Sequence, residues 1–294
     1  MTAITVDDAA AVRGHSTRSP LAVLARYEAI RFARHPLFLI CAGLLGYSAY
    51  QVHADMYANE DPAPLELSLS PAFLMGLMGL VVAYRLTRST RRADEAIEGV
   101  PADEPTRTAA LLLACLVPFS LAVLAMAHLI VAWHVEPMTW GNGWDYFSSA
   151  ERDAMMVGAA LAGLGGPVLG VCLGRWWRWP GATLLVTVVL VAWSVLTLAP
   201  WDSRLGNVWH MTSPYVLWIT GSDSDPDLAA MGGSPVWRLG YLVALIGLAA
   251  VSALLHGATG RTRETLKRWL VGLGIAAVAF LLVASLTGPT LVTL

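Results

Sequence analysis

The densest mixture of charges in the sequence lies between residues 88 and 107, where arginines and carboxylates follow one another closely. Side chains of both signs around a short helix-forming centre suit ion pairing with a complementary protein surface. We therefore name this segment the docking loop and treat it as a candidate contact site for a soluble partner. A solvated loop that only follows the charge bias of membrane proteins is the alternative. The candidate contact residues are Arg91, Arg92, Glu95, Glu98, Pro101 and Arg107.

No segment has the pattern of a nucleotide-hydrolysing loop, which needs a glycine-rich turn closed by lysine and a hydroxyl residue. Lys267 is the only lysine of the chain, and the residues around it from Glu264 to Arg268 include no glycine. The apolar runs carry no Asp, Glu, Lys or Arg in their interiors, although buried ionisable groups are typical of proton-coupled transporters. We therefore expect no enzyme activity and no cofactor. A membrane enzyme or receptor is the least favoured class.

The histidines and cysteines do not form a metal-binding pattern. His53, His134 and His210 lie near one predicted membrane face, but no two of them are four residues apart on one helix. The cysteines at positions 41, 115 and 172 all fall inside apolar runs without an evident partner. The sequence therefore predicts neither a metal site nor a disulfide.

The amino-acid composition indicates the kind of structure that holds these candidate residues in place. Of the 294 residues, 56% are hydrophobic and 14% are charged, against about 25% charged in an average soluble domain. The mean hydropathy of +0.59 indicates that lipid is the solvent for most of the chain. The expected fold is an all-α, polytopic membrane helical bundle.

Seven apolar runs, bounded by charges, tryptophan or proline, make up a transmembrane domain that we place at residues 36–294. A helix needs about 20 residues to cross the hydrocarbon core, and the last five runs approach or reach that length. The first two are marginal, because Gln51 and His53 follow the first and Glu66 precedes the second. The predicted spans are 36–52, 69–86, 108–131, 154–174, 181–199, 239–256 and 269–292.

The arginines predict the orientation. With a cytoplasmic N-terminus, only Arg152, Arg204 and Arg238 of the 19 Lys and Arg residues fall outside, which is the alternation that the positive-inside bias produces. Residues 1–19 have no apolar core, so we expect a disordered cytoplasmic tail without a cleaved signal. Seven spans then place the C-terminus outside. The preference for arginine over lysine suggests a bacterial protein of the plasma membrane.

Residues 20–35 are predicted to form a helix on the cytoplasmic surface before the first span. A serine followed by Pro20 is a good helix start. At helical spacing several alanines and Phe32 gather on one side, and charged residues such as Glu28 and Arg31 gather on the other. This amphipathic pattern favours an interfacial helix over its alternative, a solvated charged linker.

The predicted outer loop before span six contains too many apolar groups for a free loop. Residues 207–220 are rich in aromatic and aliphatic side chains, but Pro214 interrupts them and the segment is too short to cross. We expect one or two short helices that dip into the outer headgroups. Tryptophans flank both predicted faces, and only Trp193 is expected deep in a span.

The fourth predicted span carries a stripe of small residues at successive i+4 positions, which lets two helix backbones approach closely. Tight packing within the bundle is the favoured interpretation. The alternative is a hinge around Pro167 that bends the span during a transport cycle. The stripe consists of Gly158, Ala162, Gly166, Gly170 and Gly174, with Pro167 among them.

In the docking loop, Glu95 is followed by Pro101 six residues later and by Arg107 at the mouth of the third span. This order resembles the first cytoplasmic loop of type-two ABC exporter permeases, in which an acidic residue precedes a short apolar turn, a proline and a basic residue. Residues 26–36 resemble the elbow helix before the first span of that family. The outer loop before span six is similar to its short extracellular helices, so the resemblance covers most of the chain in architecture.

This resemblance implies a transmembrane subunit that exports a hydrophobic or amphipathic substrate with energy from separate ABC ATPase subunits, which would dock at Glu95. It also implies a second permease subunit, identical or homologous, in the lipid bilayer, and no nucleic acid. The seventh run departs from the usual six spans of that family. A non-transporting accessory or scaffold subunit of a larger membrane complex is the alternative.

Overall fold

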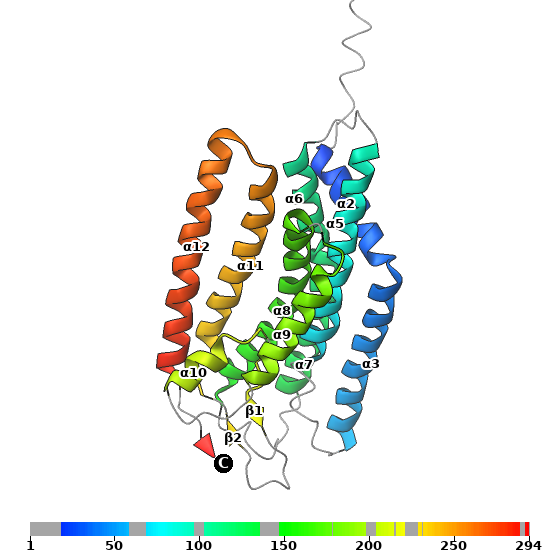
Figure 1. Cartoon of the computed structure of the whole chain (residues 1–294). Coiled ribbons are helices and arrows are strands. Elements are labelled where there is room, and N and C mark those ends of the chain that lie inside the picture. The colour runs from blue at the N-terminus through cyan, green and yellow to red at the C-terminus, as the bar shows by residue number, and fades with distance from the viewer. Residues whose placement is uncertain are drawn as a thin grey trace, which may run out of the picture.

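A computed structural model of the chain describes residues 19–58, 69–96, 103–135, 147–177, 179–197, 204–214, 216–220, 229–230, 232–288 and 292–293. In this part the chain forms a helical bundle with a small three-stranded sheet at one end (Figure 1). The elements are α2 (Pro20–Ala33), α3 (Pro36–Ala58), the π-helix η2 (Pro71–Leu77), α5 (Met78–Ala96), α6 (Glu104–Ala114), α7 (Leu116–Val135), α8 (Ser149–Trp176), α9 (Ala182–Leu196), α10 (Arg204–Met211), β1 (Ile219–Thr220), β2 (Ala229–Ala230), α11 (Pro235–Gly257), α12 (Gly260–Thr287) and β3 (Val292–Thr293).

Several of these helices are long and apolar enough to cross a bilayer, which identifies the chain as an α-helical membrane protein. Among the described residues, four helical segments meet this condition alone: Glu104–Ala132, which joins α6 to α7, and the helices α8, α11 and α12. Helices α2 and α3 meet it as a pair that is bent by 67°. Helix α9 is apolar but has 15 residues, about 22 Å of helix, which is less than the hydrocarbon core.

The helices run alternately up and down in Figure 1. We call the end where α6 begins the loop end, because both described flanks of the docking loop lie there, and the opposite end the far end. Helix α3, the α6–α7 segment, α9 and α12 run from the loop end to the far end. The η2–α5 segment, α8 and α11 run in the opposite direction. Among the described residues, four of these passes are long and apolar enough to cross a membrane, or five if the bent pair α2–α3 is counted as one span.

The helices do not begin and end where the predicted spans do. Helix α5 continues to Ala96, well past Leu86, and α12 begins at Gly260 and ends at Thr287 rather than spanning residues 269–292. Charged residues continue a helix as well as apolar ones do once it leaves the hydrocarbon, so hydropathy alone does not mark the end. Val292, assigned to the last span, lies in strand β3 instead.

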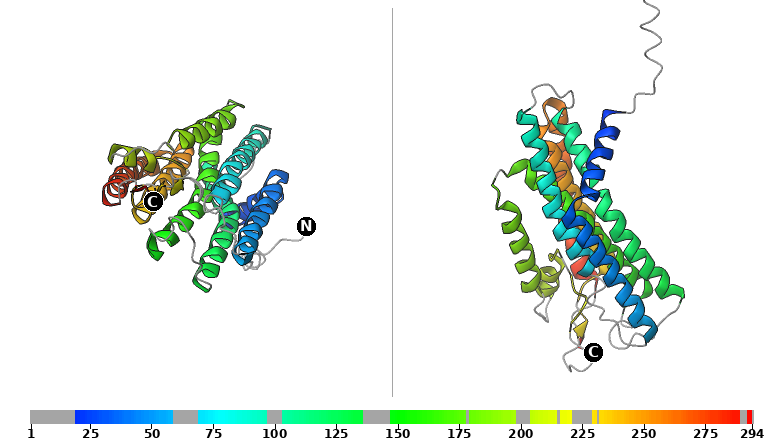
Figure 2. Two further views of the ribbon diagram at one scale, coloured as in Figure 1. Left: turned by 90° about the horizontal axis from the view of Figure 1, so that it is seen from below. Right: turned by 90° about the vertical axis from the view of Figure 1, so that its right-hand side faces the viewer.

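Helix α8 is the centre of the bundle and contacts η2, α5, α7 and α11. In its most apolar stretch 56% of the residues are buried, against 39% in the joined α6–α7 segment and 17% in both α11 and α12. Figure 2 shows the same arrangement from the far end, with α11 and α12 on one side of α8 and α3, α5 and α7 on the other. Helices α11 and α12 therefore present most of their surface outward.

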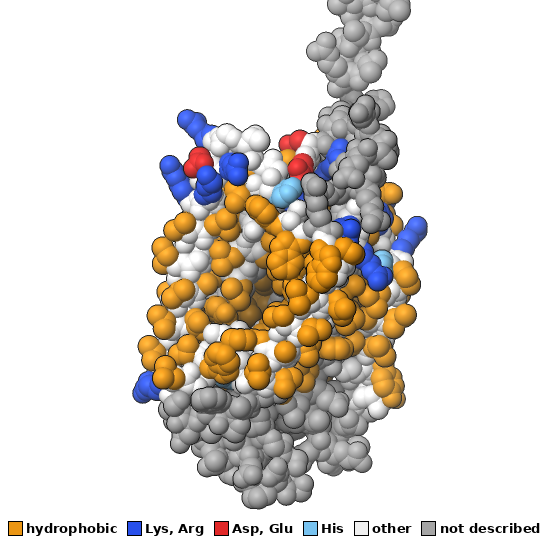
Figure 3. Space-filling view, in the orientation of Figure 1, with side chains coloured by type: hydrophobic (Ala, Val, Ile, Leu, Met, Phe, Trp, Pro, Cys, Tyr) orange, Lys and Arg blue, Asp and Glu red, His pale blue; other side chains and the backbone are white. Residues whose placement is uncertain are grey.

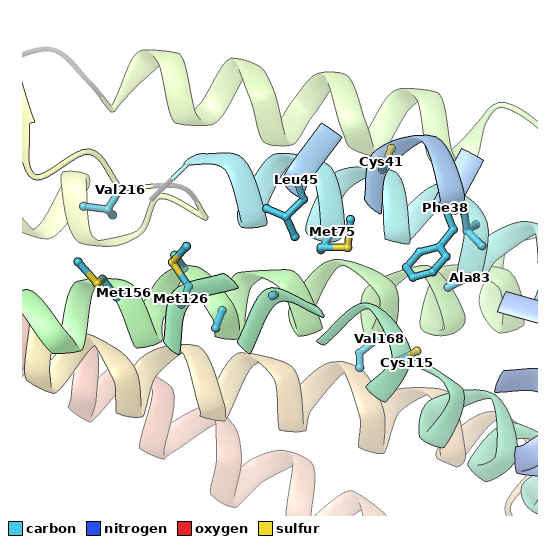
Figure 4. Close-up of a cluster of buried hydrophobic side chains, with 14 of the residues drawn as sticks. Phe38, Cys41, Leu45, Met75, Ala83, Cys115, Met126, Met156, Val168 and Val216 are labelled. Carbon is cyan, nitrogen blue, oxygen red and sulfur yellow. The ribbon is translucent and has the colours of Figure 1, made fainter. Parts of the chain in front are cut away.

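The main core fills the space between α8, α5, α7 and α3 with sulfur-containing and small side chains. Met75, Cys115 and Met126 are buried there, together with Val168 of α8 and Phe38 of α3 (Figure 4). Unbranched methionine fits irregular gaps between helices that cross at different angles. The cysteines at positions 41 and 115 are buried in this core, and all three cysteines are unpaired thiols.

The face of the bundle seen in Figure 3 is largely apolar, and most of its described charges gather toward the loop end. Leu184 of α9 and Ile275 of α12 are 70% and 67% exposed, respectively. A soluble monomer rarely leaves so much contiguous apolar surface in water, whereas lipid chains solvate it without cost. This apolar face therefore marks the part of the chain that faces the bilayer.

The end of the chain is fixed at the far end of the bundle. Strand β3 pairs antiparallel with β2, and β2 pairs antiparallel with β1, with Val292 opposite Ala230 and Thr293 opposite Ala229. Helices α11 and α12 are joined at the loop end by Ala258 and Thr259, and Gly260 with φ of 56° allows the reversal. Because α12 then runs the full length of the bundle, the C-terminal strand lies opposite to the loop end.

Candidate functional site: the loop end of the bundle

The docking loop connects two helices whose ends lie side by side at the loop end (Figures 1 and 2). The backbone of Arg91, Arg92 and Glu95 belongs to the last turns of α5, and Arg107 lies in the first turn of α6. Glu98 and Pro101 lie outside the described residues, as do the side chains of the first three. Helix α6 is capped by Asp103, whose carboxylate accepts from the backbone N–H of Thr106 at 3.3 Å.

A cluster of charged and polar side chains, of which Arg175 is buried, lies at the C-terminal end of this loop. Glu104, the first residue of α6, accepts from Nδ1 of His256 at 2.8 Å and from Nη1 of Arg175 at 3.5 Å, all through its Oε1. The Arg175 side chain is only 2% exposed. We call these three residues the Glu104 cluster. It joins the start of α6 to the last turns of α8 and α11.

Two further contacts hold the same helix ends together. The indole N–H of Trp176 donates to the carbonyl of Ser252 at 2.9 Å, and its ring packs edge-on against His256 with centroids 5.2 Å apart. The backbone of Gly257 lies close to Glu104, since a Cβ there would lie 3.0 Å from the Glu104 side chain and would require it to shift. A displacement of α6 along its axis would therefore act on α8 and α11 together.

Helix α2 joins the loop end through a second polar contact. Glu28 pairs with Arg31 at 2.9 Å, and Nη2 of Arg31 donates to the Ser89 hydroxyl of α5 at 2.7 Å. The prediction that Glu28 faces solvent was wrong, because it is 6% exposed and points inward one turn before buried Phe32. Burial is possible because Arg31 compensates the charge, and Arg175 also acts electrostatically on Glu28.

Sequence reasoning missed the Glu104 cluster. Glu104 is separated by 71 residues from Arg175 and by 152 from His256. Each residue lies at or near the end of a predicted span, where polar and charged residues are expected without any specific partner. The available signal was local: Asp103 followed by Glu104 and Pro105 is typical of a helix start, but it says nothing about which helices lie opposite.

The small-residue stripe of α8 packs against η2 and α5 along half of its length. A Cβ at Gly166 would lie 2.0 Å from the carbonyl oxygen of Gly76, and one at Gly170 would lie 2.3 Å from that of Leu80. At Gly174 the nearest group is the Thr87 side chain, at 2.7 Å. The contacts of Gly166 and Gly170 are backbone-to-backbone contacts that only glycine permits.

The other members of the stripe face elsewhere. Gly158 lies beside α11, where Leu239 and Arg238 are its neighbours, and Ala162 is half-buried. Successive i+4 positions turn by about 40° around a helix, so five of them cannot face one partner. Pro167 lies inside an unbroken α8 and fits against Gly79 of α5.

No protein-family model matches the sequence, and neither a curated protein nor a solved structure matches it.

The far end carries a polar cap formed around α10. Residues 207–220 begin within α10, which starts earlier than predicted at Arg204, and continue as an irregular segment. Arg238 of α11, 5% exposed, donates from Nη2 to the Ser213 carbonyl at 2.8 Å. Trp193, which was expected deep in a span, lies in the last turn of α9, and its ring is tilted by 51° against that of Trp209 with centroids 4.3 Å apart.

Three of the histidines are placed in separate environments. His210 of α10 contacts the carbonyl of Thr197 through Nδ1 at 3.2 Å, and burial lowers its pKa to about 4, so it is neutral at physiological pH. His134 lies 3.8 Å from Asp153, and His256 belongs to the Glu104 cluster. The structure does not describe the side chain of His53.

Proposed function

We propose that this chain is the transmembrane permease subunit of an ATP-driven ABC exporter. The observation that carries the proposal is the Glu104 cluster, which ties the C-terminal part of the docking loop to α8 and α11. A force applied to the docking loop by a soluble motor would reach the central helix of the bundle through Arg175. A solvated linker needs no such connection, because its ends need not transmit a force.

The attachment of α2 supports the same proposal. Arg31 links α2 to Ser89 and Thr90 at the start of the docking loop, so the amphipathic helix would move with the loop. We place α2 in the cytoplasmic headgroup region as an interfacial elbow helix, bent by 67° from α3. The substrate would be hydrophobic or amphipathic, since the bundle offers an apolar surface, and a second permease subunit would complete the pathway.

The charge distribution supports seven spans with the loop end in the cytoplasm of a bacterial cell. Three of the described basic residues lie toward the far end: Arg152, Arg204 and Arg238. The others lie at or near the loop end: Arg26, Arg31, Arg34, Arg85, Arg88, Arg107, Arg175, Arg261, Arg263, Lys267 and Arg268. Such an excess of basic residues marks the cytoplasmic side.

A partner ATPase is expected to co-purify with the chain from its native membrane in mild detergent. Glu95→Arg should reduce the recovered ATPase at least about tenfold, because a reversed charge in a docking contact repels the complementary basic group. The matched control is Glu264→Arg, which makes the same charge change on an exposed turn of α12 at the loop end. Quantitative mass spectrometry of the purified complexes measures the ratio of the two chains.

The rival hypothesis, an accessory or scaffold subunit, makes the opposite prediction for this pair. It expects ATPase recovery and activity to stay unchanged when Glu95 and Arg107 are both replaced. A native preparation that contains no nucleotide-binding subunit at all would remove the exporter hypothesis directly.

The topology can be tested at the C-terminus. A phosphatase that is active only outside the cytoplasm should be active when fused after Leu294, because α12 crosses the bundle and β3 lies at the far end. A fusion after Thr259, in the turn between α11 and α12, is the matched control and should be inactive. Activity of a cytoplasm-only reporter at Leu294 would contradict seven spans and favour six.

A further inference from the structure

A basic pocket opens beside α5 and the turn between α8 and α9. It has a volume of about 580 Å³ and is lined by Tyr84, Arg85, Arg88, Ser89, Pro180 and Thr183. None of these six lining residues is acidic. Two guanidinium groups and three hydroxyl groups therefore line one opening, and groups of these two kinds are the donors that bind phosphate oxygens.

The pocket is held in shape by contacts between the two elements that form it. The Tyr84 hydroxyl donates to the carbonyl of Trp179 at 2.5 Å, so α5 is fixed to the start of the α8–α9 turn. Arg88 lies over the Tyr84 ring at 5.6 Å and donates to its hydroxyl at 3.4 Å. Arg85 is exposed and has room to reach a ligand.

The position of the pocket points to the source of the phosphate. Trp176, Trp177 and Trp179 are each about half exposed near it, as expected at the headgroup level of a bilayer. Immediately beyond Thr183, the outward face of α9 is apolar, with Leu184 70% and Val188 55% exposed. A molecule with its phosphate at the arginines could lay its hydrocarbon chains along α9.

We propose that this pocket binds the phosphate group of an anionic phospholipid from the leaflet at the loop end. The guanidinium groups of Arg85 and Arg88 pair with the phosphate, and Thr183 donates a hydrogen bond. The acyl chains cover α9, which is short and has few contacts with the rest of the bundle. The bound lipid thereby attaches α9 to α5. This inference does not depend on the proposed transport function.

The test uses the full chain in nanodiscs and compares Arg85→Gln/Arg88→Gln with the matched pair Arg263→Gln/Arg268→Gln. The second pair removes the same charge from exposed positions of α12 at the same end. Native mass spectrometry measures how much phosphatidylglycerol each protein retains, and phosphatidylcholine and inorganic phosphate serve as competing probes. We expect the pocket pair to lose about tenfold or more in phosphatidylglycerol retention, and the control pair to lose less than twofold.

Equal losses in both pairs would overturn the proposal, because they would show attraction to the general basic surface. Displacement of the lipid by inorganic phosphate alone would also overturn it, since the site would then take a free anion. Thermal melting in phosphatidylcholine nanodiscs checks that the variants are folded. If the double variant Arg85→Gln/Arg88→Gln is unfolded, the single variant Arg85→Gln replaces it, because the Arg85 side chain is exposed. A loss of phosphatidylglycerol retention in this variant and not in the control pair then supports the pocket.

Discussion

Replacing Gly166 with alanine is expected to lower the stability of the protein by about 3 kcal/mol or more, because one added methyl group collides with backbone. The new Cβ would lie 2.0 Å from the Gly76 carbonyl oxygen, and neither the π-helix η2 nor α8 can yield as a flexible side chain does. The helices must separate, and the separation exposes cavities along the whole contact. A fall of roughly 10 °C in melting temperature in detergent should result.

The matched control is Gly274→Ala in α12, another helical glycine of the chain. No atom lies within 4 Å of the added Cβ there, so alanine should stabilise the helix slightly, by about 0.5–1 kcal/mol through its higher helix propensity. Comparable melting temperatures for the two variants would show that α8 and η2 do not pack at backbone contact. That result would support a mobile hinge at residues 165–167 instead.

Glu104→Gln is expected to uncouple the docking loop from the bundle. The change keeps the shape of the side chain but removes the charge that pairs with Arg175, which is 2% exposed. Because the Glu104 side chain is 42% exposed and water screens part of the interaction, we expect a loss of only about 1–3 kcal/mol in stability. On the proposed function, ATPase binding should persist while substrate-stimulated ATP hydrolysis falls about tenfold.

Two comparisons separate coupling from stability in this experiment. Glu264→Gln breaks an exposed ion pair with Lys267 at 2.8 Å and should change neither property. The double variant Glu104→Leu/Arg175→Met replaces the ion pair by apolar groups and should recover stability without recovering coupling. Full stimulated hydrolysis in that double variant would contradict a coupling role for the Glu104 cluster.

The sequence by itself determined the class of the protein and the order of its helices. Long apolar runs exclude water as solvent, and a bilayer leaves a chain of this composition no alternative to helices because backbone groups must be paired internally. The helix start at Pro20 was also predictable, because the capping serine and the proline act on the backbone of their nearest neighbours in the sequence. The glycine stripe also indicated that α8 would meet another helix closely.

Only the tertiary structure decided which groups face one another. Glu104, Arg175 and His256 come from three helices, and nothing local to any of them specifies the other two. Glu28 shows the same limit, because its charge predicted exposure. Its partner Arg31 lies three residues away on the same helix, and only the packing of α2 against α6 and α5 buries the pair's carboxylate. Local sequence fixes hydrogen bonding within a helix, whereas the rotation of one helix against another depends on packing summed over the whole bundle.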